Sequence, residues 1–248
     1  MKRRIDDNFW LFNIPIAHRG LFDENYPENS LGAYKQAIDN GYGIELDVHM
    51  SIDGVLFCYH DNNAKRLCGI DKDVRDMTYE EVKNLSLNKS DYYIPTFKEV
   101  LTFIDGKTPL CIEVKTQKYS GIEEKVVEML REYKGDFVVQ SFNPKIMRKI
   151  SKLAPEFIIG MLTTREISPL APKIINYMMH QLWFKYYVKF DYLNMRVQDL
   201  EFYKDKIKKY LVICWTCKNE NDRIIAEKYA RNIIFEKTLT NLGKFKKQ

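Results

Sequence analysis

The stretch "GYGIELDVHMSIDGVLFCYHD", residues 41–61, decides how the chain folds. Its first half alternates aliphatic residues with Glu45, Asp47 and His49, and an Asp-Gly pair then marks a turn into a second short run. Side chains two residues apart share one face of a strand, so the two carboxylates and the imidazole are predicted to project together. A strand with one face in water would show the same alternation, so the rest of the chain must decide between a solvated and a functional face.

The composition is that of a globular protein. The chain has 248 residues, of which 45% are apolar, so it can form one large domain or two small ones with a sizeable core. Lys and Arg outnumber Asp and Glu by 39 to 34, but they are spread along the chain. Nucleic-acid binding needs a concentrated basic stripe and is therefore not expected. Asp6 and Asp7 interrupt any N-terminal hydrophobic segment, so we predict no targeting signal and a cytoplasmic location.

The five cysteines, an odd number, suggest no disulfide framework and favour a reducing compartment. Cys214 and Cys217 have the spacing of a redox or zinc motif, but they lie in the apolar run "YLVICWTC", which is predicted as a strand. In an extended strand their Cα atoms would be about 10 Å apart on opposite faces, beyond the roughly 7 Å limit for a disulfide. No second Cys/His pair completes a zinc site. Neither a redox nor a zinc role is therefore expected.

Short strand-like runs recur along the chain, and helix-like segments such as "GIEEKVVEMLREY", residues 121–133, lie between them. Eight strands alternating with helices over about 250 residues are typical of a TIM (β/α)8 barrel. An open doubly wound α/β sheet is the alternative, but no glycine-rich turn follows the first strand. We predict one α/β barrel domain over residues 1–248, with residues 62–93 as an excursion beside the site. The predicted strands are residues 14–20, 43–49, 110–116, 137–142, 157–162, 192–197, 211–216 and 232–236.

A barrel changes the interpretation of the charged strand. Barrel strands are covered by helices outside and by packed side chains inside, so no face is simply solvated. The run "CIEVKT" repeats the pattern with Glu113 and Lys115, and catalytic groups of this fold lie at C-terminal strand ends. We call Glu45, Asp47 and Glu113 the carboxylate triad. Convergence would raise their pKa values unless a cation lies among them, and oxygen-only ligation suits Mg²⁺ or Ca²⁺. An internal Glu113–Lys115 ion pair that holds the barrel is the alternative.

An ordered set of short motifs resembles the glycerophosphodiester phosphodiesterase family. The resemblance is dense from about residue 15 to 116 and thins to "QSFN" and "CWT" further along. A single "HRG" would mean little, whereas the ordered set is highly specific. The motifs are "AHRG" at 17–20, "PENS" at 27–30, "IELDV" at 44–48, "DG" at 53–54, "HD" at 60–61, "IPTFKEVL" at 94–101 and "IEVK" at 112–115.

The resemblance implies an activity and a role for four residues. Members of the family hydrolyse glycerophosphodiesters to glycerol 3-phosphate and an alcohol, and this small-molecule substrate class is expected here. The family's general acid and base correspond to His18 and His60, and its phosphate-binding cations to Arg19 and Lys115. The nucleophile can be water or the glycerol hydroxyl next to the phosphate, which would give a cyclic intermediate. The sequence does not choose between them.

The same resemblance implies that the carboxylate triad binds a divalent metal ion, Mg²⁺ or Ca²⁺. It also places Asn29, Gln140 and Trp215 at the substrate pocket. A helix N-cap explains Asn29 equally well, and core packing is the alternative for the other two. His49 shares the acidic face but matches no catalytic position of the family, so a supporting or structural role is expected.

One departure and two rival functions remain. Where the family commonly ends its last strand with Thr-Asp, this chain has Phe235 and Glu236, which weakens the match at that strand end. A barrel that only binds a phosphorylated ligand would show losses among the site positions, and none is lost. A lysophospholipase D-like or phospholipase-like enzyme would share the metal and the histidines but accept an acyl chain, and residues 172–190 support this alternative.

Residues 172–190, "PKIINYMMHQLWFKYYVKF", are predicted as a barrel helix that is too short and too basic to span a bilayer. Its second face is more apolar than a solvated surface needs. We expect that face to cover the site mouth, to contact a second copy in a homodimer or to rest on a membrane surface, with plain packing as the alternative. The predicted core face is Ile175, Met179, Leu182, Trp183, Tyr186 and Phe190, and the second face carries Tyr177, Phe184, Tyr187 and Val188.

Overall fold

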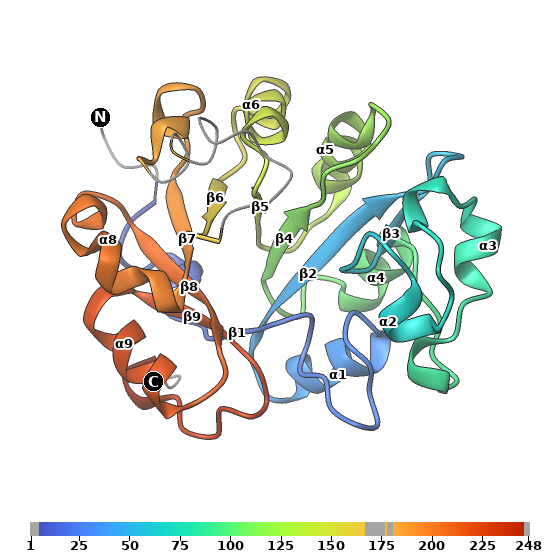
Figure 1. Cartoon of the computed structure of the whole chain (residues 1–248), viewed down its shortest axis with the longest axis horizontal. Coiled ribbons are helices and arrows are strands. Elements are labelled where there is room, and N and C mark those ends of the chain that lie inside the picture. The colour runs from blue at the N-terminus through green and yellow to red at the C-terminus, as the bar shows by residue number, and fades with distance from the viewer. Residues whose placement is uncertain (1–4, 167–176, 178–180, 246–248) are drawn as a thin grey trace. The chain divides into compact units, whose positions relative to one another are not determined.

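The computed structural model describes residues 5–166, 177 and 181–245. The chain forms two compact units (Figure 1). The first unit comprises residues 16–139, and the second comprises residues 1–15 and 140–248. Each unit is described by itself.

The first unit is built on parallel strands. Strand β1 (Ile16–Ala17) pairs with β2 (Gly43–Met50), and β2 pairs with β4 (Leu110–Val114). Strand β3 (Leu56–Cys58) returns antiparallel to β2 through the predicted Asp-Gly turn. All eight residues of β2 are buried. The solvated-face interpretation of residues 41–61 is therefore wrong.

Three longer helices cover this unit, and local sequence signals define where they begin. Helix α1 (Leu31–Asp39) is capped by the Ser30 hydroxyl, which accepts the Ala33 N–H at 3.2 Å, and it contacts β2 and α4. Helix α4 (Phe97–Ile104) begins with a capping box between Thr96 and Glu99. Helix α5 is Ile122–Glu132. The apolar stripes of these helices pack onto the sheet and so hold the strand ends in register.

The excursion lies between β3 and α4 and has a small core of its own. Its elements are α2 (Lys65–Cys68), a 3-10 turn at Val74–Asp76, α3 (Tyr79–Lys83) and a 3-10 turn at Leu87–Lys89. Buried side chains from the excursion pack with residues of the β3 segment and hold these short elements together: Phe57, Tyr59, Ala64, Leu67, Val74, Met77, Val82, Leu87 and Ile94.

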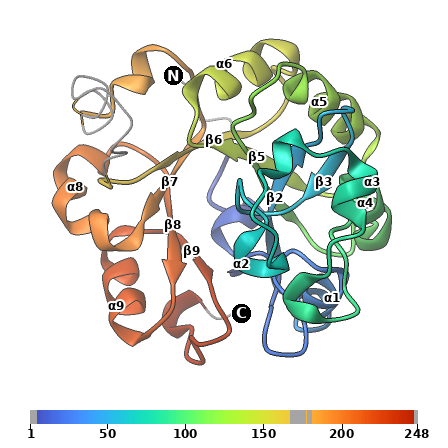
Figure 2. The ribbon, with the colours of Figure 1, turned by 45° about the vertical axis from the view of Figure 1, so that its right-hand side comes forward.

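The second unit repeats the pattern of parallel strands with helices between them. Strand β6 pairs with β7, β7 with β8 and β8 with β9, all in parallel. Helices α8 and α9 pack side by side next to β8 in both views (Figures 1 and 2). Strand β5 (Phe137–Ser141) spans the boundary between the units. The other bounds are a 3-10 turn at Trp10–Phe12, α6 Pro144–Leu153, β6 Ile159–Thr163, β7 Tyr192–Arg196, a 3-10 turn at Val197–Asp199, α8 Leu200–Ile207, β8 Val212–Cys217, α9 Glu220–Tyr229, β9 Asn232–Phe235 and a 3-10 turn at Gly243–Phe245.

All eight predicted strands are present in the described part of the chain. The prediction of a TIM (β/α)8 barrel with a small excursion is confirmed. Among the described residues, no helix is long and apolar enough to cross a membrane.

Two local predictions are wrong. Cys214 and Cys217 do not lie far apart on opposite faces, because the pairing of β8 with β9 shifts register between them and breaks the alternation. Their sulfur atoms are 3.9 Å apart, and both side chains are buried and free.

The other error concerns residues 172–190, most of whose first half lies outside the described residues. Leu182 is left-handed and a 3-10 helix at Trp183–Tyr186 follows, so the described part does not continue a helix. Phe184, predicted on the exposed face, is buried, whereas Tyr186, predicted in the core, is 79% exposed. The predicted division into two faces therefore does not hold.

Candidate active site

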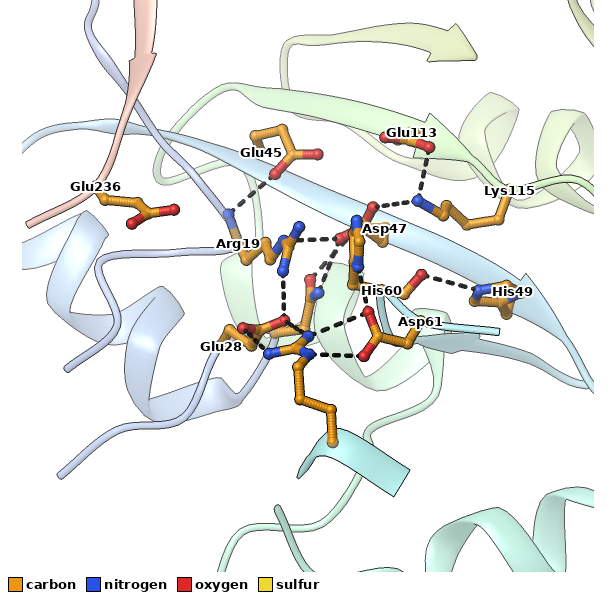
Figure 3. A network of polar contacts seen from close by, with 12 residues as sticks. Arg19, Glu28, Glu45, Asp47, His49, His60, Asp61, Glu113, Lys115 and Glu236 are labelled. Atoms are coloured by element: carbon orange, nitrogen blue, oxygen red, sulfur yellow. Dashed lines mark hydrogen bonds and ion pairs between the residues drawn. The ribbon is translucent and has the colours of Figure 1, made fainter. Parts of the chain in front are cut away.

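Parallel pairing of β2 with β4 assembles the carboxylate triad within the first unit. Asp47 is the register partner of Glu113, and Glu45 lies two residues earlier on the same strand. One carboxylate oxygen from each of the three lies within 4.8 Å of the others, and all three side chains are buried (Figure 3). The sequence predicted this convergence from the shared parity of the three residues. Three buried oxygen ligands are the donor set that Mg²⁺ or Ca²⁺ prefers.

Lys115 lies among these carboxylates. Its Nζ is 2.8 Å from Glu113 Oε1 and 3.2 Å from Asp47 Oδ1, so the internal ion pair considered as an alternative is present. Burial acts to lower the pKa of Lys115, but Glu113 and Asp47 outweigh it and raise the pKa above its usual value. Lys115 is therefore held as a cation beside the triad.

The single positive charge of Lys115 does not balance the charges of three buried carboxylates. Burial, Asp47 and Glu113 raise the pKa of Glu45 well above its usual value. Burial also acts to raise the pKa of Asp47, but the nearby charges of Lys115, His60 and Arg19 hold it low. Burial is the largest cause of the raised pKa of Glu45 and the two neighbouring carboxylates add to it, so a bound cation would favour the ionised form of Glu45.

The turn after β1 presents Arg19 to the triad. The backbone N–H of Arg19 donates to Glu45 Oε2 at 3.0 Å, and its Nε lies 3.6 Å from Asp47 Oδ2. Gly20, at φ 80°, closes the turn, and a Cβ there would lie 2.8 Å from the carbonyl carbon of Ala33 on α1. The "HRG" turn and helix α1 are thus packed directly on each other.

Asn29 points at the triad and is not the cap of α1. Its Nδ2 donates to Asp47 Oδ2 at 3.0 Å, while its Oδ1 accepts the Tyr34 hydroxyl at 3.0 Å and the Asp47 N–H at 3.3 Å. The capping role that the sequence allowed for Asn29 belongs to Ser30. Asn29 therefore orients the Asp47 carboxylate.

The two predicted catalytic histidines flank this group. His18 directly follows β1, whose register on β2 brings it to the level of Glu45, and it is half-buried. His60 Nδ1 lies 2.6 Å from Asp61 Oδ1. A carboxylate only accepts hydrogen bonds, so Nδ1 carries the hydrogen and Nε2 is the ring nitrogen left for proton transfer.

His49 is a neutral support behind His60. Gln117 Nε2 donates to His49 Nδ1 at 3.1 Å, so Nε2 carries the hydrogen that reaches the His60 carbonyl oxygen at 3.3 Å. Burial and the charge of Lys115 lower the pKa of His49 to about 3. The ring therefore stays uncharged and holds the backbone of His60.

The two remaining predicted site residues lie in the second unit. Gln140 is buried, and its Oε1 accepts hydrogen bonds from the Tyr192 hydroxyl at 3.2 Å and from Asn194 Nδ2 at 2.9 Å. Trp215 packs edge-on against Phe142, with ring centroids 5.4 Å apart. At the divergent strand end, Glu236 pairs with Lys218 at 2.8 Å.

Sequence reasoning missed four polar residues of the first unit that hold the predicted ones: Glu28, Asp61, Arg66 and Gln117. Glu28 lies in the motif "PENS" and Asp61 in the motif "HD", so the sequence contained a signal for these two residues.

A cleft of about 680 Å³ opens beside His60 and Lys115. Its other lining residues are all polar or charged: Asp61, Asn62, Asn63, Lys65, Arg66 and Asp71.

A sequence model of the glycerophosphoryl diester phosphodiesterase family matches residues 18–235, which include every predicted site residue. The chain belongs to this family. A glycerophosphodiester phosphodiesterase of Caldanaerobacter subterraneus subsp. tengcongensis is 38% identical over 161 residues, covering 60% of this chain and 66% of that protein. The chain thus spans just under two thirds of the length of the curated relatives it matches.

Solved structures of the family share the fold. A glycerophosphodiester phosphodiesterase from Thermotoga maritima matches with a TM-score of 0.68 and 26% identity, covering 91% of this chain and 95% of its own. A phosphodiesterase from Oleispira antarctica, solved in complex with the product sn-glycerol-3-phosphate, matches with a TM-score of 0.70 and 23% identity. That match covers 90% of this chain and 93% of the other.

Proposed function

We propose that this chain hydrolyses glycerophosphodiesters to glycerol 3-phosphate and an alcohol, with His18 and His60 as general acid and base. The observation that carries the proposal is the carboxylate triad with Lys115 and Arg19 beside it, within one compact unit of a family member. The product bound to the Oleispira antarctica relative supports the same substrate class.

The triad fits a divalent metal ion, Mg²⁺ or Ca²⁺. Its three oxygen donors are buried within 4.8 Å of one another, and burial together with the two neighbouring carboxylates raises the pKa of Glu45, a shift that a bound cation would reverse. A bound divalent ion would supply positive charge that offsets the negative charge building on the phosphoryl oxygens in the transition state.

Arg19 and Lys115 would bind the phosphate. Within the described residues, the buried Nε of Arg19 has no hydrogen-bond acceptor, since the Asp47 oxygen at 3.6 Å is too far. A phosphate oxygen would satisfy this donor, and Lys115 adds a second cation on the cleft side. Together they would fix the diester between the two histidines.

The histidines would divide the proton transfers. One imidazole, neutral, takes the proton of the nucleophile, which is water or the adjacent glycerol hydroxyl; the other, protonated, gives a proton to the leaving alkoxide. For His60, the hydrogen bond from Nδ1 to Asp61 leaves Nε2 as the nitrogen that exchanges the proton. Both roles need imidazoles that gain and lose protons near neutral pH.

The cleft beside His60 favours a small polar alcohol as the leaving group. Its lining residues are all polar or charged, which suits a hydroxylated or charged head group. Hydrolysis of lysophospholipids is the second candidate, and exposed aromatic side chains of the second unit support it. They are Tyr177, Trp183, Tyr186 and Tyr187, and they would rest on a membrane surface or a second copy of the chain.

We also propose that the chain works as a single barrel domain in the cytoplasm, which five free cysteines support. The deciding experiment offers the purified chain glycerophosphocholine, glycerophosphoethanolamine and a lysophospholipid, each with Mg²⁺ and with Ca²⁺, and measures released glycerol 3-phosphate. We expect release from the glycerophosphodiesters. If no glycerophosphodiester is hydrolysed with either metal, the proposal is wrong.

A further inference from the structure

Arg66, on the short helix α2 of the excursion, joins two carboxylates that each hold a different site residue. Its Nε and Nη2 donate to the Asp61 carboxylate at 2.7 and 3.2 Å. Its Nη1 and Nη2 donate to the Glu28 carboxylate at 2.8 and 2.7 Å. The single guanidinium of Arg66 therefore donates four hydrogen bonds, two to each carboxylate.

Each of these carboxylates is bonded in turn to a residue of the proposed chemistry (Figure 3). Asp61 Oδ1 accepts from His60 Nδ1 at 2.6 Å, and Glu28 Oε1 accepts from Arg19 Nη1 at 2.6 Å. Two chains of contacts therefore start at Arg66, one ending at a catalytic imidazole and one at the phosphate-binding guanidinium.

We propose that Arg66 is a positioning residue, whose guanidinium orients the His60 ring through Asp61 and the Arg19 side chain through Glu28. The inference rests on the proposed function, because it assigns roles relative to that reaction. Arg66 lines the cleft with His60, so the excursion would set the geometry of the site as well as its outer wall.

The geometry separates this contact from an ordinary surface ion pair. An isolated exposed pair contributes little to stability because both side chains remain mobile, and the Arg66 side chain is itself 46% exposed. Here both carboxylates are fixed by a second partner, and Glu28 is buried. A planar fork can bond two carboxylates at once, whereas the ammonium of a lysine is a single point of charge.

Arg75 provides a matched control in the same excursion. Its Nε and Nη2 donate to the Asp73 carboxylate at 2.9 and 2.7 Å, so it forms the same kind of bidentate pair. Asp73 has no bond to His60 or Arg19 among the described contacts. Arg75→Ala therefore removes a bidentate ion pair, together with the 3.2 Å hydrogen bond from Arg75 Nη1 to the Thr116 carbonyl oxygen, without touching either chain of contacts.

The kinetic test compares Arg66→Ala, Arg66→Lys and Arg75→Ala with the parent in glycerophosphodiester hydrolysis. We expect Arg66→Ala to lower kcat/KM about 10- to 100-fold, the range for partners that orient a functional side chain. Arg66→Lys should recover only a small part of the lost kcat/KM, and Arg75→Ala should keep kcat/KM within about twofold of the parent value. In a His60→Ala background, Arg66→Ala should lower kcat/KM by a smaller factor, because one chain of contacts is already broken. Equal losses in both backgrounds, or an Arg66→Lys variant as active as the parent, would overturn the proposal.

A second measurement is independent of turnover. The chain has only four histidines, so ¹⁵N-histidine NMR can resolve His60, with His60→Ala assigning its signals. We expect one tautomer, with the hydrogen on Nδ1, in the parent and in Arg75→Ala, and a mixture in Arg66→Ala. An unchanged His60 signal in folded Arg66→Ala would contradict the positioning role. If the parent hydrolyses no glycerophosphodiester, the proposed function fails while this spectrum still decides the role of Arg66.

Discussion

The side-chain amide of Asn29 donates a 3.0 Å hydrogen bond to the carboxylate of Asp47, and the Tyr34 hydroxyl holds the other end of the same amide at 3.0 Å. Removing the amide should free the Asp47 carboxylate to rotate and weaken metal binding about 10- to 100-fold. Asn29→Gly suits the left-handed backbone at this position, where φ is 55°. The Mg²⁺ or Ca²⁺ concentration for half-maximal activity measures the effect. Tyr34→Phe should give a smaller shift in the same direction, and an unchanged metal requirement in Asn29→Gly would contradict this role.

A second prediction concerns the metal itself. Chelation should abolish hydrolysis and readdition of Mg²⁺ or Ca²⁺ should restore it. The ion should also raise the melting temperature of the parent, because it offsets the repulsion that, together with burial, raises the pKa of Glu45. Glu45→Gln removes one ligand charge and should lose most of that thermal shift. Full activity in excess chelator would exclude the metal assignment.

The histidines should separate into two classes. His18→Ala and His60→Ala should each lower kcat by at least about 100-fold with the fold intact, the usual scale for a positioned acid or base. His49→Ala should lower the melting temperature but reduce kcat far less, because its buried neutral ring acts on the His60 backbone. Circular dichroism and steady-state kinetics of the three variants test this. A His49→Ala protein that is folded yet as inactive as His18→Ala would show that the division is wrong.

The 3-10 turn at Trp183–Tyr186 yields a prediction about the second unit. Phe184 is buried, so Phe184→Ser should lower the free energy of unfolding by about 3 kcal/mol. The double change Trp183→Ser with Tyr186→Ser alters exposed side chains and should leave that free energy within about 0.5 kcal/mol. Denaturant unfolding measures both.

The same double variant tests the membrane and dimer proposals. We expect it to bind anionic liposomes more weakly than the parent, or to form fewer dimers, without any change in glycerophosphodiester hydrolysis. If liposome binding, dimerisation and the ratio of lysophospholipid to glycerophosphodiester activity all stay the same, the aromatic side chains have no such role.

Strand parity explains why so much of the first unit could be predicted. In a parallel sheet, the alternation along β2 and β4 fixes which side chains share a face, so Glu45, Asp47 and Glu113 could be brought together before the register was known. Helix starts at Ser30 and Thr96 carry local capping signals that need no tertiary context.

Features that depend on distant partners could not be predicted in this way. The contact between Arg66 and Glu28 joins a helix residue and a turn residue 38 positions apart, and only the packed fold decides which of many charges meet. The register shift between Cys214 and Cys217 has no local signal, so the assumption of a regular strand placed the sulfurs wrongly. In residues 172–190, aromatic residues occur on both predicted helical faces, so periodicity alone did not identify the buried ones.

Arg19 and Asn29 both have left-handed backbones, with φ of 57° and 55°, a conformation that costs an arginine about 1–2 kcal/mol and an asparagine less, and that glycine adopts freely. A programme of directed evolution for heat resistance would therefore favour glycine at both positions, and each such step would remove a side chain that contacts Asp47. Selection for stability and selection for the proposed activity would therefore favour different residues at these two positions of the chain. A heat-resistant variant would have to gain stability from substitutions elsewhere in the chain. On helix surfaces remote from the "HRG" turn, such substitutions would leave the site residues unchanged.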